Sequence, residues 1–511
     1  MMPKPLLLAG RLENGRKLLE NLERQFIIES GVQETRTAVF LDTFDWRLYR
    51  AGYVLKFCYK TYLLQRLKDQ SPAADTTSGI KRPYRFSGEF PAGTLRQLLV
   101  PIIGVRALLP VLSLEETIQP LRLLNQEEKT LVRLEFTTLA SAGEPALQVS
   151  IIPLRGYNKA ARRVTDLIHG LGGFEPVSSI FDIMQTFGNL QPGGYSSKID
   201  VVLNPGQRAD EAARQILLRL RETMKANEPG IVEDIDSEFL HDYRVSVRRT
   251  RAVLGQVKQV FPTEKVDHFR TIFAELGQQT NLLRDLDVYL LSQEHFLQLL
   301  PFHLQPGLTA FFLQLKRKRR SALSQVRRLL HSPAYEQYMA EWEGFLLPPP
   351  GDTAEGENAG RPIEELASFF IHRRYRQIVK AGNRITPASP DEELHKLRIS
   401  GKKLRYLLEF FSSLYPPVEM EGLIGKLKRL QDNLGEFNDL SVQQDYLNRY
   451  LDTLDDERTG EILTAAAIGG LLARLHERHQ QVRKSFAKTF SQFNVSELQA
   501  TFHHLFGSRR P

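Results

Sequence analysis

Short runs rich in β-branched and aromatic residues dominate the hydrophobic pattern of the first 200 positions. Such runs predict β-strands, and helical periodicity is confined here to residues 95–100 and 158–171. Gly and Pro residues punctuate the connections between the runs. We therefore expect residues 1–200 to form an α+β domain built on an antiparallel sheet. The predicted strands cover residues 38–43, 53–59, 131–136 and 146–152.

Beyond residues 204–206 the apolar positions recur at i, i+3 and i+4, which predicts helices throughout residues 205–511. A stretch rich in Pro and Gly at residues 347–361 is typical of a flexible linker. It separates a first helical half, residues 207–346, from a second half, residues 362–511. The predicted helices cover residues 211–225, 238–261, 266–294, 307–331, 335–345, 362–380, 391–414, 419–451, 461–493 and 496–506.

The two helical halves repeat each other at a fixed offset. His241 is followed by His395 after 154 residues. A shared offset over roughly sixty residues indicates an internal duplication. We therefore expect two similar four-helix bundles, related by a pseudo-two-fold axis. The same offset maps Arg244, Arg248, Arg251 and Asp285 onto Arg398, Lys402, Arg405 and Asp439.

Each half contains a short basic helix in which a His is followed by cations at i+3, i+7, i+8 and i+10. A helix advances about 100° per residue, so i, i+3, i+7 and i+10 fall within roughly 80° of arc. These positions therefore form one basic stripe on each helix, opposite an apolar face for packing. The stripes comprise His241, Arg244, Arg248 and Arg251 in one half, and His395, Arg398, Lys402 and Arg405 in the other.

Composition places the chain in a broad class. A length of 511 residues suggests two to four domains. Lys and Arg number 68 against 60 for Asp and Glu, a net charge of +8, which favours a polyanionic partner such as nucleic acid, polyphosphate or an anionic membrane. The single cysteine, Cys58, excludes a disulfide framework and fits a reducing interior. We find neither a signal peptide nor a run of roughly 20 apolar residues, and expect a soluble cytoplasmic protein with no membrane partner.

The helical region lacks the motifs of common enzymes. It has no Gly-rich phosphate loop, and residues 476–479 do not have the spacing of a zinc-binding helix. The pair His241-Asp242 is not preserved in the second half, where Lys396 follows His395. We expect no catalytic residue, metal or cofactor here. We expect Asp285 and Asp439 to pair with the basic stripes or to cap helices, rather than to bind a metal.

Both basic helices resemble the CHAD domain, which is named for its conserved histidines in an α-helical fold. The His-plus-cation pattern and the later Asp285-Leu286 and Asp439-Leu440 segments match that family in both halves. The resemblance covers residues 205–511. It implies binding of inorganic polyphosphate and association with polyphosphate granules.

Residues 40–43, with Leu48, Gly52 and residues 54–57, resemble a strand pair of the CYTH domain, the triphosphate-tunnel family of eight-stranded barrels. Active members carry a Glu-x-Glu-x-Lys strand near the N-terminus, whose carboxylates hold a divalent metal. Residues 4–11 of this chain contain no acidic pair, and a later strand offers only Glu135. The resemblance therefore implies a degenerate barrel or sheet, kept for structure or anion binding.

The leading interpretation is a polyphosphate-binding protein without catalysis, in which the two stripes form the walls of a basic groove. Two alternatives remain open: a divalent-metal-dependent inorganic triphosphatase or polyphosphatase in the N-terminal domain, and nucleic-acid binding. Nucleic acid ranks lower because the stripes offer only Tyr243 and Tyr406 for base stacking. A cation run at residues 316–320 is a further candidate for the groove. The candidate polyphosphate-binding residues are His241, Arg244, Arg248, Arg249, Arg251, His395, Arg398, Lys402, Lys403, Arg405, Arg219, Lys225, Arg374 and Lys380.

Overall fold

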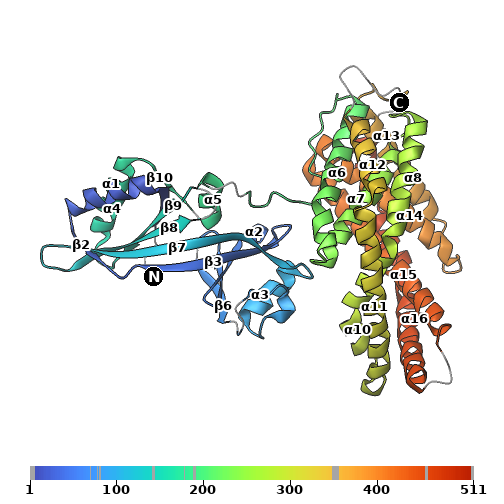
Figure 1. Ribbon diagram of the computed structural model, residues 1–511. Coiled ribbons are helices and arrows are strands. Elements are labelled where there is room, and N and C mark those ends of the chain that lie inside the picture. The colour runs from blue at the N-terminus through green and yellow to red at the C-terminus, as the bar shows by residue number, and fades with distance from the viewer. Residues whose placement is uncertain are drawn as a thin grey trace. The chain divides into compact units, whose positions relative to one another are not determined.

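The chain forms two compact units, Met1–Ser196 and Ser197–Pro511, in the computed structural model (Figure 1). The structure describes residues 6–69, 71–77, 79, 82–140, 144–177, 179–187, 191–347, 356–454 and 459–507. The first unit is built on strands and the second is helical.

The first unit contains one ten-stranded antiparallel sheet. The strand order is β10-β1-β9-β8-β7-β3-β4-β5-β6, and β2 pairs with β7. Among the strands that the structure describes, β6 and β10 do not pair with each other, so the sheet is open. The strands are β1 (Leu6–Arg11), β2 (Ile27–Ser30), β3 (Glu34–Thr43), β4 (Tyr53–Cys58), β5 (Thr61–Arg66), β6 (Pro72–Thr77), β7 (Leu108–Leu124), β8 (Thr130–Ala140), β9 (Ala146–Pro153) and β10 (Phe174–Pro176).

Helices α1 (Leu12–Glu23) and α4 (Asn158–Leu171) lie together on the sheet (Figure 1). Leu18 of α1 and Val164 of α4 are fully buried in a core shared with strand residues such as Leu134. Burial of one such side chain contributes about 1.5–3 kcal/mol, so this core anchors both helices. A second core, under α3 (Thr94–Ile103), contains residues of β4 and β5.

A buried carboxylate shapes the turn after β3. Asp42 accepts hydrogen bonds from the backbone N–H groups of Thr43, Leu48 and Tyr49 at 2.7, 2.9 and 2.9 Å. Burial raises the pKa of Asp42 to about 6, although these three donors favour its charged form. The side chain therefore fixes the short helix α2 (Arg47–Arg50) at the end of β3.

The second unit is helical throughout its described elements. Its first half contains α6 (Ala209–Val232), α7 (Ser237–Gln256), α8 (Thr263–Gln279), α9 (Asn281–Leu291), α10 (Gln293–Gln298), α11 (Gln305–Leu330) and α12 (Pro333–Leu346). Its second half contains α13 (Ile363–Gly382), α14 (Asp391–Phe410), α15 (Pro417–Leu451), α16 (Thr459–Phe493) and α17 (Ser496–Phe506). The expected division into a sheet region and a helical region is confirmed.

The two halves differ over one stretch, where α8, α9 and α10 of the first half correspond to the single helix α15 of the second half. The sequence predicts one continuous helix over residues 266–294, but the first half has separate helices α8 and α9 that meet at Thr280. The Thr280 hydroxyl donates to the carbonyl oxygen of Leu276 at 2.8 Å, within the last turn of α8. The corresponding helix of the second half, α15, is continuous for 35 residues. A threonine that binds its own helix carbonyls favours a break, which periodicity does not reveal.

Most of the predicted linker, residues 348–355, lies outside the described residues. The part that follows is packed rather than free. Ala359 is 3 % exposed, and the Asn358 backbone N–H donates to the carbonyl oxygen of Gln259 at 2.8 Å. The Ala209 backbone N–H in turn donates to the Arg361 carbonyl oxygen at 2.9 Å. Residues 356–361 are therefore fixed to the first helical half.

The two halves contact each other at several places, among them α7 against α14, α11 against α16 and α6 against α13 (Figure 1). On α11, Oε1 of Gln314 accepts a hydrogen bond from the Tyr450 hydroxyl of α15 at 2.7 Å, and the Gly307 carbonyl oxygen accepts one from the Thr464 hydroxyl of α16 at 3.3 Å. These contacts hold the two helical halves together.

Among the described residues, no helix is both long and apolar enough to cross a membrane.

Packing around Gly382 supplies a stability prediction. A Cβ at Gly382 would overlap the ring of Phe490, so Gly382→Ala overpacks the contact between α13 and α16. We expect the free energy of unfolding of the helical unit to fall by about 1–3 kcal/mol. Gly422→Ala is the control, because a Cβ there meets nothing within 4 Å, and should stabilise α15 by about 0.5–1 kcal/mol. Chemical denaturation followed by circular dichroism measures both; equal stabilities would contradict the packing.

Candidate functional site

The candidate site is built on α7 and α14, whose apolar faces are buried in the two helical halves. Tyr243 and Val247 of α7 are 0 % and 1 % exposed, and Leu397 and Leu404 of α14 are equally buried. Asp236 caps α7 by accepting a hydrogen bond from the Glu238 backbone N–H at 2.9 Å. Packing of these faces directs the cation stripes away from each core, as the helical spacing predicts.

Arg244 is held at the junction of α8 and α9. Its Nη1 donates to the carbonyl oxygen of Gly277 at 2.7 Å and to the Thr280 hydroxyl at 2.6 Å. Its Nη2 donates to Oδ1 of Asn281 at 2.5 Å. Burial, with the charge of Arg248, lowers the pKa of Arg244 to about 10. The last carbonyls of a helix lack partners within the helix, and Arg244 satisfies one of them.

The equivalent cation of α14 uses a carboxylate instead. Arg398 Nη2 lies 3.3 Å from Oδ1 of Asp439 on α15, as expected for Asp439. Burial lowers the pKa of Arg398, Asp439 opposes that lowering, and Arg248 adds to it. His395 Nδ1 lies 2.6 Å from Oδ1 of Asn438. In the first half, the charge of Asp285 favours the charged form of Arg244 and so opposes the lowering of the Arg244 pKa by burial.

The two stripes lie beside each other where α7 contacts α14, and the pKa of Lys402 is affected by cations of both helices. Burial lowers this pKa to about 8, and the charges of Arg398 and Arg248 add to the shift. Arg248 belongs to the other half of the chain, so α7 and α14 bring their cations together. We define the central cation cluster as Arg244, Arg248, Arg398, Lys402 and Arg405.

Carboxylates only partly balance this cluster. Asp439 and Asp285 lie beside it, and Glu409 accepts a hydrogen bond from Arg405 Nε at 2.6 Å. Arg248 and Arg251 are exposed, and neither has a protein hydrogen-bond or ion-pair partner within the described part of the chain. The half-buried His241 lies on the same stripe as Arg244. An anion would therefore find unpaired charge here.

Two of the predicted cations turn away from the cluster. Arg249 donates to Oε2 of Glu409 at 2.7 Å and to the carbonyl oxygen of Ser197 at 2.8 Å, so it ties α7 to α14. Lys403, the equivalent position of α14, faces Arg374 and Arg270 instead; burial lowers its pKa first, and those charges lower it further. Position i+8 lies some 80° around the helix from i, which explains the different surroundings.

The flanking cations are also placed elsewhere. Arg219 and Lys225 form ion pairs along their own helix, with Glu222 at 3.3 Å and Glu228 at 2.6 Å. Lys380 lines a separate pocket between α13 and α17. None of the three shifts a pKa within the central cation cluster. Sequence spacing alone grouped residues that the fold distributes over different surfaces.

The cation run at residues 316–320 is not one surface. Arg319 forms ion pairs with Asp287 and Asp234 at 2.6 and 2.7 Å and is half-buried. Its neighbours Lys318 and Arg320 are exposed. Arg319 therefore stabilises α11 against α9, and the run does not act as a unit.

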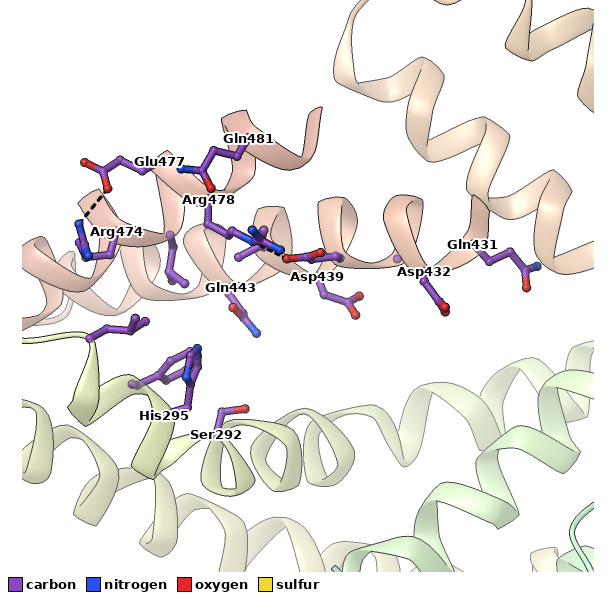
Figure 2. A pocket seen from close by; sticks show the side chains of 16 residues that line it. Ser292, His295, Gln431, Asp432, Asp439, Gln443, Arg474, Glu477, Arg478 and Gln481 are labelled. Atoms are coloured by element: carbon purple, nitrogen blue, oxygen red, sulfur yellow. Dashed lines mark hydrogen bonds and ion pairs between the residues drawn. The ribbon is translucent and has the colours of Figure 1, made fainter. Parts of the chain in front are cut away.

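A pocket of about 830 Å³ adjoins the cluster at Asp439 (Figure 2). It lies between α10, with the preceding Ser292, on one side and α15 and α16 on the other. Arg478 Nε lies 2.6 Å from Glu436 Oε1, and Arg474 Nη1 lies 3.1 Å from Glu477 Oε2, so both cations of this pocket are already paired. Asp432 and Asp439 leave the lining with more carboxylates than cations. Anion binding is therefore expected at the cluster and not in this pocket.

Sequence reasoning missed the groups that hold the cations in place. Thr280, Asn281 and Glu409 were not singled out, because a neutral or single acidic residue carries no pattern along the chain. Asn438 lies in the segment that the repeat had marked, next to Asp439, but its contact with His395 needed the fold.

The first unit has a polar pocket of about 560 Å³ on its sheet. Glu116 is 4 % exposed and accepts hydrogen bonds from Arg36 Nε at 2.9 Å and Lys56 Nζ at 2.6 Å. The first strand, β1, carries no carboxylate, and the described residues contain no group of three or more His, Cys, Asp or Glu that could hold a metal. These residues do not fit the metal site of an active triphosphate tunnel.

The meeting of the two stripes can be tested through the Lys402 titration. We expect NMR to give a Lys402 pKa of about 8, and Arg248→Met to raise it, because a like charge is removed. Lys402→Arg assigns the signal, and Arg328→Met, an exposed cation on α11, should leave the pKa unchanged. A Lys402 pKa near the ordinary value of 10.5 that Arg248→Met does not change would contradict the placement of Arg248 beside Lys402.

The depressed pKa also has a consequence for stability. The unfolded chain keeps the Lys402 proton up to its ordinary pKa of 10.5, whereas the folded chain loses it near 8. The contribution of this group to the free energy of unfolding therefore rises as pH rises between these values.

Comparison with known proteins finds one matching family and several similar solved structures. The family model of the CHAD domain matches residues 215–448. No curated protein sequence matches the chain significantly. The chain is similar to the CHAD domain from the plant Ricinus communis, with 24 % identity over 60 % of this chain and 96 % of that one, and a TM-score of 0.47.

Two other solved structures are similar over different shares of the chain. PptA from Streptomyces chartreusis has 15 % identity, covers 56 % of this chain and 100 % of its own, and has a TM-score of 0.43. A Hippeastrum protein studied as an adenylyl cyclase, and found to have a dominant triphosphatase activity, has 13 % identity over 38 % of this chain and 99 % of its own, with a TM-score of 0.26. The family model spans both basic helices and both Asp-Leu segments, and residues 215–448 of this chain are therefore a CHAD domain.

Proposed function

We propose that this chain binds inorganic polyphosphate at the central cation cluster, with Arg251, His241 and His395 extending the contact. The observation that carries the proposal is the contact of α7 with α14, which places Arg248 beside Arg398 and Lys402; burial and these charges lower the pKa of Lys402. A bound polyanion would stabilise the cluster, because its negative charge offsets the repulsion between neighbouring cations.

The chemistry of the cluster suits a flexible phosphate chain. Arginine grips phosphate oxygens with two parallel N–H bonds, and Lys402 adds a point charge. Polyphosphate carries a dense line of negative charge, so its binding should release counterions and weaken as salt increases, as for nucleic acid. The exposed Arg248 and Arg251 offer donors without protein partners among the described residues.

Nucleic acid fits the same residues less well. Tyr243 is 0 % exposed, and its hydroxyl lies 3.3 Å from that of Tyr335. Tyr406 is half-buried, and its ring stacks with Phe410 at 6.1 Å. Base recognition without sequence preference relies on accessible aromatic rings, which neither residue supplies. Competition between polyphosphate and RNA at fixed salt would separate the two ligands.

The sheet unit has no described set of groups for metal-dependent hydrolysis. Glu116, its most buried carboxylate in the sheet pocket, is occupied by Arg36 and Lys56. We assign this unit a structural or anion-binding role and derive no catalytic step from it. Association of the whole chain with polyphosphate granules would follow from binding at the helical unit.

Removal of two cluster cations tests the proposal. Arg248→Ala/Lys402→Ala should weaken binding to long-chain polyphosphate by about tenfold or more. The slope of log affinity against log salt should fall by about two, since each phosphate-bound cation contributes about one. Binding to immobilised polyphosphate across a salt series measures both values.

The matched control removes two exposed cations from other surfaces, Arg328→Ala/Lys488→Ala. It lowers net charge equally and should leave affinity close to that of the unmodified chain. If both double variants bind alike, net charge and not the cluster accounts for binding. Arg244 is unsuitable as the first target, because its loss also frees the junction of α8 and α9.

A further inference from the structure

A second pocket, of about 860 Å³, lies between α13 and α17 on the second helical half. A volume of this size is within the range of roughly 300–1,000 Å³ that small-ligand sites occupy. Its polar lining is provided by Arg373, Arg376, Lys380, His372, His503 and Gln499. None of the residues that line it carries a carboxylate.

The three cations of this pocket are available to a ligand. Arg373, Arg376 and Lys380 are exposed, and within the described residues none has a hydrogen-bond or ion-pair partner. They lie at i, i+3 and i+7 of α13, so they share one face and span roughly 10 Å along the helix. His503 on α17 is exposed beside them.

The first helical half shows the same helix pair with its charges neutralised. Arg376 and Lys380 correspond to Arg221 and Lys225, which precede them by 155 residues. Arg221 Nη2 lies 2.5 Å from Glu343 Oε2 on α12, which packs on α6 as α17 packs on α13. Lys225 Nζ lies 2.6 Å from Glu228 Oε2.

The second half has no carboxylate at the position of Glu228. At the same spacing, Glu228 corresponds to Asn383, whose side chain instead accepts a hydrogen bond from Asn494 at 3.0 Å. The duplicated halves therefore differ in charge at a shared position. The cations of the second half remain exposed on a concave surface, where the first half pairs them.

A buried hydroxyl is a further sign of an incomplete polar site. Tyr375 lines the pocket and is 5 % exposed. Its hydroxyl has no hydrogen-bond partner among the described residues. A buried polar group without a partner usually costs about 1–3 kcal/mol, so such groups often mark the place of a ligand or water.

We propose that the pocket between α13 and α17 binds a small anion with more than one phosphate group. Linked phosphates match cations that are spread over roughly 10 Å along the helix better than a single phosphate does, because they can contact all three together. Arginine forks and the His503 ring supply donors, and the absence of carboxylates from the lining removes repulsion. Phe369 provides an apolar wall for a ligand that also has a ring.

Two classes of ligand have this chemistry, and either could be the source of the linked phosphates: a short inorganic phosphate chain and a nucleoside triphosphate. The site is separate from the central cation cluster, because none of its residues belongs to that cluster. The inference therefore does not depend on polyphosphate binding at α7 and α14, and short anions can test it alone.

The experiment uses the full chain with Arg248→Ala/Lys402→Ala as background, which weakens binding at the central cation cluster. Isothermal titration with tripolyphosphate, and separately with ATP, should show one bound anion per chain for at least one of the two. Addition of Arg373→Ala/Arg376→Ala should weaken that binding by about tenfold or more. Addition of Arg328→Ala/Lys488→Ala is the charge-matched control and should leave it unchanged.

Each result decides the proposal. Binding of tripolyphosphate alone, of ATP alone or of both anions supports the site if the pocket variant removes that binding, and binding of only one of them identifies the source. Binding of neither anion, or binding that the pocket and control variants change equally, overturns it. Arg373 and Arg376 are exposed, so loss of fold is not expected, and circular dichroism of each variant checks this. Arg376→Lys keeps the charge and should retain part of the affinity.

Discussion

Repulsion between like charges at the contact of α7 and α14 is the constraint that shapes the helical unit. Packing of the two apolar helix faces forces Arg248 towards Arg398 and Lys402, and the chain holds this arrangement with few opposing charges. The ion pair between Arg249 and Glu409 joins the same two helices beside the cluster. The ion-paired Arg249 and the repelled Arg248 are adjacent residues of α7, because side chains at i+7 and i+8 face different surroundings.

The duplicated halves use equivalent positions in different ways. Arg244 satisfies a helix-end carbonyl, whereas Arg398 pairs with Asp439. Arg249 forms an interhelical ion pair, whereas Lys403 faces other cations. A duplication therefore preserves the backbone and the placement of positive charge, while the neighbouring carboxylates decide which cation is structural and which remains open to a ligand.

The sheet unit illustrates the same balance on a smaller scale. Glu116 accepts hydrogen bonds from both Arg36 and Lys56, so cations that point into a polar pocket are neutralised inside the fold. Breaking such a buried arrangement by removing one partner is costly, because it leaves an uncompensated charge. These ion pairs stabilise the sheet around the pocket. Arg36 and Lys56 thus differ from Arg248, which has no ion-pair partner among the described residues.

Local pattern determined the class of each region, because strand and helix periods depend on neighbouring residues. It predicted β3, β4, β8 and β9 and most helices, and the constant offset placed two basic stripes at equivalent positions. The break at Thr280 and the long strand β7 escaped it, since side-chain capping and sheet pairing carry little periodic signal. The fold alone decided which cations share a surface. Charge is visible in a sequence, whereas the partner that cancels it lies far away along the chain, as Glu409 does for Arg249.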